Sequence, residues 1–308
     1  MANVTPLETI LRRDRAVILG ALGVVVLASW AYVLAGAGMG MSAWKMSSLD
    51  LALGRVEPMP MGEVSAGAMS SGPMNAGEMS GGQMSCTMGD AMSAMATPAR
   101  WNLEYAGIMV SMWWVMMIAM MVPSAAPMIL LYAAVARRQR EKGAEALLPT
   151  GIFAWGYVAV WGFFSVIAAA LQWGFEAAGT LSPMTMNSTS LLFAAAILLA
   201  AGLYQLTPAK QACLRHCRGP IRFLMGRWCP GRWGALRMGA EHGAYCLGCC
   251  WALMTLLFFG GVMNLYWIAG LAVMILLEKT IPAGDTLGKV TGGLLMLWGA
   301  TFLYQAVA

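Results

Sequence analysis

Long apolar runs alternate with short polar segments along the chain. A helix needs about 20 apolar residues to cross the hydrocarbon core of a bilayer. By that measure the pattern predicts seven spans, of which the sixth is short, at residues 17–36, 105–136, 152–178, 191–206, 245–262, 266–277 and 290–307. Hydrophobic residues make up 59% of the chain and charged residues only 11%, which excludes a soluble globular protein. We therefore predict an all-α, polytopic membrane helix bundle of about seven transmembrane helices.

The first apolar run follows Arg12, Arg13 and Arg15, as a signal peptide would. It is longer than the apolar core of a signal peptide, which spans about 7–15 residues, so we predict a retained membrane anchor. Cleavage would leave six spans. The chain then divides into an N-terminal tail with the first anchor (1–36), a flexible outer loop rich in Met, Gly and Ser (37–104) and a six-helix membrane domain (105–308) that includes a basic segment at 207–243.

Lysine and arginine set the orientation. Sixteen of the 19 basic residues fall on the side of the N-terminus, and the other three, Lys45, Arg55 and Arg100, lie in the loop at 37–104. The positive-inside rule then places the N-terminus in the cytoplasm and the C-terminus in the periplasm of a bacterial inner membrane. The net charge of +5 reflects this topology and contact with anionic lipid, and does not indicate nucleic-acid binding.

The second apolar run contains the segment GIMVSMWWVMMIAMMVPSAAPM at residues 107–128. On a helix, most of its methionines fall within an arc of roughly 80°, and the others extend that arc along one side. The stripe consists of Met109, Met112, Met116, Met117, Met120, Met121 and Met128. Pro123 and Pro127 each free the carbonyl four residues earlier, which protein or a cavity must then cover. The stripe fits a site or path for a soft metal and, equally well, packing by flexible side chains.

Methionine also recurs in the outer loop, every five residues at first, as AMSSG, PMNAG, EMSGG and QMSCT. The loop has too few large apolar residues to fold alone, so these side chains have no core to fill. Thioether sulfur is soft and selects Cu(I) over hard ions. We predict weak metal capture by Met69, Met74, Met79, Met84, Cys86, Met88, Met92 and Met95, and by Met184 and Met186 in a later outer turn. Low-complexity drift is the alternative.

Six of the seven cysteines and both histidines lie between residues 213 and 250. At helical spacing each of two groups shares one face. Cytoplasmic cysteines remain free thiols, and thiolate with imidazole suits Cu(I) or Zn(II). We predict metal ligands at Cys213, His216 and Cys217, and at His242, Cys246, Cys249 and Cys250. The alternative is that these cysteines are small residues that let membrane helices approach closely.

Few charged or amide side chains fall near the apolar runs. Gln172 and Glu176 lie near the outer end of the third span, where we expect water to solvate them. Glu278 and Lys279 end the sixth span and mark its inner edge. The spans contain no acid–base pair suited to catalysis, so we predict that the chain is not an enzyme.

Three segments carry a resemblance to a known family: MMIAMMVPSAAPM, YQLTPAKQACLRHCRGP and HGAYCLGCCWALMTLLFFGGVMNLYWIAGLAVMILLEK. They resemble a bacterial family of metal-binding integral membrane proteins, often labelled copper chaperones. The resemblance covers roughly residue 105 to the C-terminus, and CLRHC and CLGCCW are its most distinctive parts. It implies metal handling. The long Met-rich loop lies outside the shared region and favours copper in particular.

We therefore expect a Cu(I)-binding inner-membrane protein that captures copper in its outer segments and relays or delivers it through membrane methionines to cysteine and histidine, where zinc would also fit. Its expected partners are membrane lipid and a copper enzyme or another copper carrier. A homo-oligomer is compatible with the sequence. Two alternatives are a redox or electron-transfer subunit and a metal-free assembly factor for a membrane complex.

Overall fold

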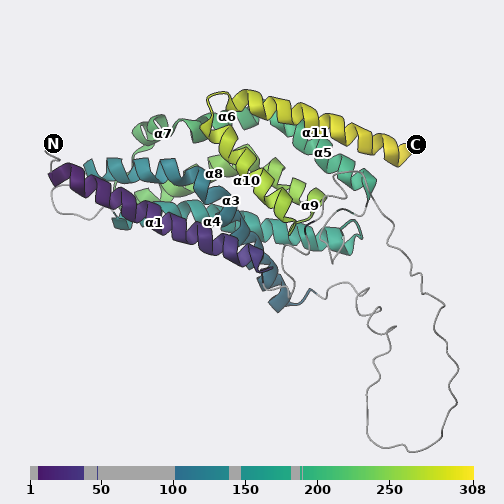
Figure 1. Cartoon of the computed structure of the whole chain (residues 1–308), viewed down its shortest axis with the longest axis horizontal. Coiled ribbons are helices and arrows are strands. Elements are labelled where there is room, and N and C mark those ends of the chain that lie inside the picture. The colour runs from purple at the N-terminus through teal and green to yellow at the C-terminus, as the bar shows by residue number, and fades with distance from the viewer. Residues whose placement is uncertain (1–5, 38–46, 48–100, 139–146, 182–187, 189) are drawn as a thin grey trace, which may run out of the picture. The chain divides into compact units, whose positions relative to one another are not determined.

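The computed structural model describes residues 6–37, 47, 101–138, 147–181, 188 and 190–308. Within these residues the secondary structure is helical, apart from one isolated bridge between Leu181 and Ser188. The helices are α1 (Pro6–Leu34), α3 (Leu103–Arg138), α4 (Leu147–Ala177), α5 (Leu191–Leu206), α6 (Pro208–Arg218), α7 (Pro220–Arg227), α8 (Gly231–Met254), α9 (Leu256–Gly260), α10 (Leu265–Thr280) and α11 (Gly284–Val307) (Figure 1).

Five helical segments in the described part are long and apolar enough to cross a membrane: α1, α3, α4, the run from Gly231 to Gly260 formed by α8 and α9, and α11. A sixth arises if α5 and α6, which are bent by 63° at Thr207, count as one span. Helix α10 has 16 residues and is shorter than a full span. The all-helical membrane architecture is confirmed at this level, whereas the predicted number of seven spans is not. The loop at 37–104 lies almost wholly outside the described residues.

Local sequence signals explain where several of these helices begin. Thr207 caps α6, accepting a hydrogen bond from the Lys210 amide, and Pro208 takes the first helical position, where no amide hydrogen is needed. Asn264 caps α10 in the same way. Helix α8 starts at Gly231, well before the predicted residue 245. Pro230 is the N-cap residue of α8, and a proline is not tolerated in the interior of a helix, so the helix begins after it.

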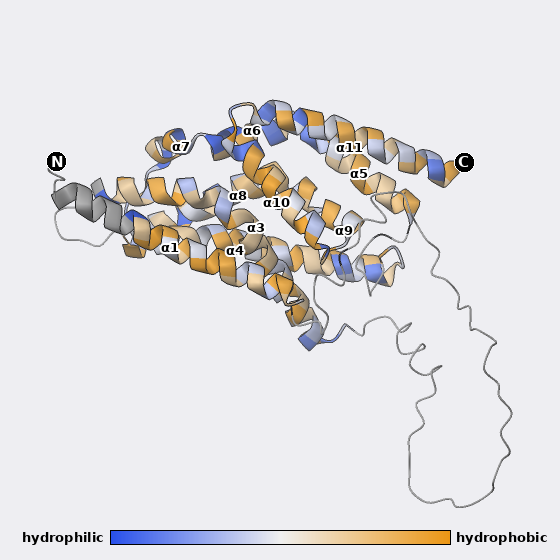
Figure 2. Cartoon of the chain, in the orientation of Figure 1, coloured by the Kyte–Doolittle hydropathy of each residue, from blue (hydrophilic) through white to orange (hydrophobic). Residues whose placement is uncertain are grey.

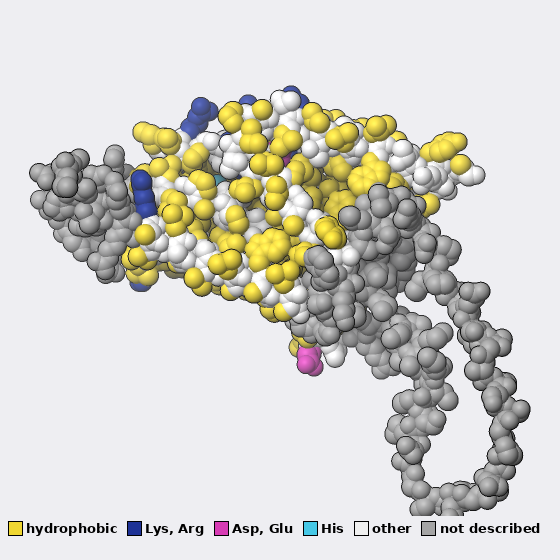
Figure 3. Space-filling view, viewed as in Figure 1, with side chains coloured by type: hydrophobic (Ala, Val, Ile, Leu, Met, Phe, Trp, Pro, Cys, Tyr) yellow, Lys and Arg dark blue, Asp and Glu magenta, His cyan; other side chains and the backbone are white. Residues whose placement is uncertain are grey.

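Glycine allows the closest helix contacts. A Cβ atom on Gly239 of α8 would collide with the backbone of Phe153 in α4, and one on Gly156 would collide with Leu236 of α8. Helices α5 and α11 lie side by side for the same reason, with Gly202 facing Gly292 (Figure 1). Apolar residues run along the helices in Figure 2, and Figure 3 shows hydrophobic side chains covering most of the visible described face. This surface is suited to lipid.

One ion pair is buried among these helices. Lys210 of α6 and Glu278 of α10 form a salt bridge with side chains 0% and 2% exposed, and Lys210 also donates to Gln205 of α5. Gly288 of α11 leaves room for the pair, since a Cβ atom there would meet the Glu278 carboxylate. Removing either partner would leave an uncompensated buried charge. The pair therefore fixes α10 and α11 against the bend between α5 and α6.

Gly239→Ala tests the contact between α4 and α8. The added methyl group must displace Phe153 backbone, so we expect a loss of about 1–3 kcal/mol in unfolding free energy, measured as a lower melting temperature in detergent. Gly151→Ala on α4 is the matched control, because a Cβ atom at that position meets nothing within 4 Å. Its helix propensity gain should leave the melting temperature unchanged or higher. Equal melting temperatures for the two variants would contradict the close contact.

Candidate metal centre

The methionine stripe of α3 is buried along its whole length. Each of its seven side chains is at most 2% exposed. Helix α3 continues through Pro123 and Pro127, and Ala119, whose carbonyl Pro123 frees, is 1% exposed and so is covered by protein. Burial alone does not separate packing from metal binding. The stripe has different neighbours along its length: Met121 meets cysteine, and Met109 lies next to a group that contains a carboxylate.

At one end the stripe reaches a group of four thiols, which we name the thiol cluster. Cys246 is central to it, because the thiols of Cys249 and Cys250 both donate to its carbonyl oxygen, and Cys217 contacts Cys249. Helix α6 supplies Cys217, and α8 supplies the other three. The two sequence groups thus meet in space. All six cysteines of the described residues are free thiols, as predicted.

Two sulfur pairs join separate helices at the thiol cluster. Cys217 Sγ lies 3.9 Å from Cys249 Sγ, and Cys250 Sγ lies 3.9 Å from Met121 Sδ. With metal–sulfur bonds of about 2.3 Å, two sulfurs on a tetrahedral ion are about 3.8 Å apart. Both pairs therefore have the separation of two ligands that share one soft ion.

The thiols are in a hydrogen-bonded arrangement. Cys249 and Cys250 both point at the carbonyl oxygen of Cys246, at 3.1 and 2.9 Å. Within the described residues, no group of three or more His, Cys, Asp and Glu has the geometry of a formed metal site. Thiols that donate to a carbonyl do not converge on one point. Binding a metal requires these protons to leave and the sulfurs to turn away from the carbonyl.

Sequence reasoning missed two residues that contact Cys246. Lys279 Nζ lies 2.9 Å from Cys246 Sγ and 3.2 Å from Ser124 Oγ. The Tyr157 hydroxyl lies 3.0 Å from Cys246 Sγ and donates to the Met121 carbonyl at 3.2 Å. The available signal was a lysine next to an apolar run, which within a membrane indicates a functional site. Lys279 therefore places a cationic donor on the Cys246 sulfur, whereas the Tyr157 hydroxyl, whose proton goes to the Met121 carbonyl, accepts there.

The two histidines have different surroundings. His242 is 4% exposed, one helical turn before Cys246, and its ring packs among Phe153, Tyr157 and Phe223. Its Nδ1 atom is buried with no hydrogen-bond partner, so it is available as a ligand. His216 is exposed instead. Its ring stacks on Tyr245 at 4.2 Å, and its Nδ1 atom contacts the Ala212 carbonyl, away from the thiol cluster.

The remaining predicted ligands lie apart or are not described. Cys213 is half-buried, and its sulfur packs over Gly248, where a Cβ atom would come within 2.8 Å. The predicted capture residues of the outer segments, Met69, Met74, Met79, Met84, Cys86, Met88, Met92, Met95, Met184 and Met186, lie outside the described residues.

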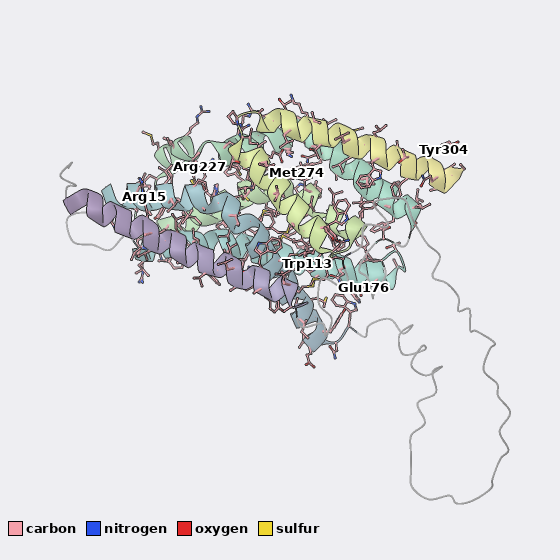
Figure 4. All side chains as sticks on the ribbon, in the orientation of Figure 1. Arg15, Trp113, Glu176, Arg227, Met274 and Tyr304 are labelled. Carbon is pink, nitrogen blue, oxygen red and sulfur yellow. The ribbon has the colours of Figure 1, made fainter. Side chains whose placement is uncertain are left out.

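At its other end the stripe reaches a polar group, which we name the carboxylate cluster: Trp101, Met109, Trp113, Gln172 and Glu176. Glu176 accepts hydrogen bonds from the Trp101 indole at 2.7 Å and the Gln172 amide at 2.9 Å. The expectation that water solvates Gln172 and Glu176 is wrong. Their side chains are 0% and 9% exposed, because tryptophan and amide donors replace water. Figure 4 shows Trp113 and Glu176 at one end of the helices and Arg227 at the other.

Residues 110–302 match PpoB2, a family described as a copper chaperone. The chain belongs to the PpoB2 family. The match includes six of the seven stripe methionines, both histidines and the thiol cluster. No curated protein and no solved structure matches the chain. Membership in PpoB2 confirms the resemblance to copper chaperones and supports a copper-related role for the chain.

Tyr157→Phe tests the hydrogen bonds at Cys246. The change removes a buried hydroxyl that contacts Cys246 Sγ and donates to the Met121 carbonyl. We therefore expect a loss of about 1 kcal/mol in unfolding free energy, measured as a lower melting temperature in detergent. Tyr304→Phe is the control, because Tyr304 is 75% exposed. If both variants melt at the temperature of the unchanged protein, the Tyr157 contacts are not formed as described.

Proposed function

We propose that this PpoB2 protein is a bacterial inner-membrane Cu(I) carrier. Met-rich outer segments capture copper, the methionine stripe conducts it through the membrane, and the thiol cluster holds it for delivery to a copper enzyme or another carrier. The observation that carries the proposal is the contact between Met121 and Cys250, whose sulfurs lie 3.9 Å apart. There a thioether of α3 meets a thiol of α8.

The chemistry of the two sulfur types supports this direction. Thioethers are neutral and bind Cu(I) weakly, whereas thiolates are anionic and bind it more tightly. An ion that moves from Met121 to Cys250 therefore moves to a stronger ligand. Thioether neighbours also favour Cu(I) over Zn(II), which proteins hold with cysteine, histidine and carboxylate. Zinc remains an alternative occupant of the Cys and His side chains alone.

The length of the stripe suits a relay. Met109 and Met121 are twelve residues apart on one helix, which corresponds to about 18 Å at 1.5 Å per residue. That is more than half of the roughly 30 Å hydrocarbon core. All members are buried, so an ion passing between them would avoid contact with lipid. Packing alone would not require a methionine of the stripe to lie against a cysteine sulfur.

The basic residues support the proposed orientation. Helices α6 and α7, next to the thiol cluster, carry Arg215, Arg218, Arg222 and Arg227. Under the positive-inside rule, that end faces the cytoplasm and anionic lipid. The thiol cluster then lies where the cell keeps cysteine reduced, and the carboxylate cluster lies toward the periplasm.

The first experiment measures copper in the purified, detergent-solubilised protein after Cu(I) loading under reducing conditions. We expect stoichiometric copper in the unchanged protein. Replacing Cys246, Cys249 and Cys250 together by serine should weaken Cu(I) binding at least about 100-fold, because even changes next to metal ligands cost 10–100-fold. Cys229→Ser is the control: this cysteine precedes α8 and lies outside the thiol cluster.

Three results would contradict the proposal. Absence of copper in the loaded, unchanged protein favours the metal-free assembly factor. Equal losses in the Cys229 variant and the triple variant remove the thiol cluster as the site. A haem absorbance band in the purified protein supports the electron-transfer alternative.

A second experiment tests the stripe. Met116→Leu with Met120→Leu keeps the volume and apolar character of two buried side chains and removes their sulfur. We expect unchanged copper content at the thiol cluster, but at least tenfold slower Cu(I) accumulation in spheroplasts that express the protein. Met225→Leu is the control, because Met225 is 82% exposed on α7. Equal accumulation rates for both variants would assign the stripe to packing.

A further inference from the structure

Glu176 is a buried carboxylate to which the described part of the chain brings no cationic partner. Its two oxygens accept hydrogen bonds from N–H groups of Trp101 and Gln172. Among the residues that the structure describes, no lysine or arginine forms an ion pair with it. A negative charge at this depth without a counter-ion is costly unless a cation visits it.

Gln172 joins this charge to the methionine stripe. Its amide nitrogen donates to Glu176 and lies 3.7 Å from Met109 Sδ, while its oxygen accepts from the Trp113 indole at 2.8 Å. The Gln172 amide is therefore oriented by Trp113, and its N–H side faces both the carboxylate and the first thioether. The carboxylate oxygen and the thioether sulfur are both electron-pair acceptors of the same N–H side, so a cation that displaced this amide would meet both of them.

A monovalent metal ion needs such a charge to enter the stripe. Thioethers are neutral, so an ion among them loses its hydration without gaining a counter-charge. Near Met121, cysteines that lose their protons on metal binding would compensate the charge. At the other end, Glu176 accepts a hydrogen bond from Gln172, whose amide nitrogen also contacts Met109 Sδ.

We propose that Met109 and Glu176 form the entry site for a soft monovalent cation, Cu(I) or Ag(I). Met109 supplies the soft ligand, Glu176 the counter-charge, and Gln172 holds the two together. This inference rests on the proposed relay and identifies the site at which the ion enters it.

Ag(I) binding to the full-length protein, measured by equilibrium dialysis in detergent, tests the site. Met109→Leu should remove one weakly bound ion and leave the tight binding of the thiol cluster intact. Glu176→Gln should weaken that same ion at least about tenfold, because the lost attraction acts at short range in a medium of low dielectric constant. The double variant should bind as Met109→Leu does, since both changes then affect one site.

Glu104→Gln is the matched control. Glu104 lies in the first turn of α3 at the same end of the helices, and it is exposed. The entry site is overturned if Glu176→Gln binds Ag(I) like the unchanged protein, or if Glu104→Gln weakens binding equally, which would indicate general surface charge. If the relay itself is wrong, the variant of Cys246, Cys249 and Cys250 binds Ag(I) as tightly as the unchanged protein does. The comparison of Glu176→Gln with Glu104→Gln still decides the entry site in that case.

Discussion

The close approach of α4 and α8 is the constraint on which the centre depends. Glycines at 156 and 239 let the two backbones touch, and a Cβ atom at either position would collide with the opposite helix. This contact brings Tyr157 against Cys246 and packs Phe153 against His242. Wider spacing would leave three cysteines facing a gap in the membrane. These glycines therefore position the cysteines by allowing the two helices to pack closely.

Several polar groups inside the described helices form separate sets. Lys210 with Glu278 locks α6 to α10, Lys279 contacts Cys246, and Glu176 takes hydrogen bonds from Trp101 and Gln172. Adjacent residues of α10 thus face different sets, Glu278 toward the bend of α5 and α6 and Lys279 toward the thiol cluster. In a bilayer each unsatisfied polar group costs several kcal/mol. The two buried lysines named here each contact a group on a partner helix.

The sequence predicted the all-helical membrane architecture, because apolar run length is a local property, but its seven spans are not confirmed. It also predicted that the stripe methionines share a face. It could not show that Cys217 would meet Cys249, since that contact depends on the bend after α5 and the start of α8 at Gly231. His216 shares a helix with Cys217, yet its ring stacks on Tyr245. Glu176 was expected in water because the tryptophan that covers it is distant in sequence.

The central claim is that copper rests where the methionine stripe meets the thiol cluster. X-ray absorption at the copper edge tests it directly on protein that contains selenomethionine and is loaded with one equivalent of Cu(I), because selenium then marks thioether ligands and sulfur marks cysteine. The account predicts both selenium and sulfur next to the same copper, and loss of the selenium signal in Met121→Leu. Copper with sulfur neighbours alone, or with selenium neighbours alone, would contradict it.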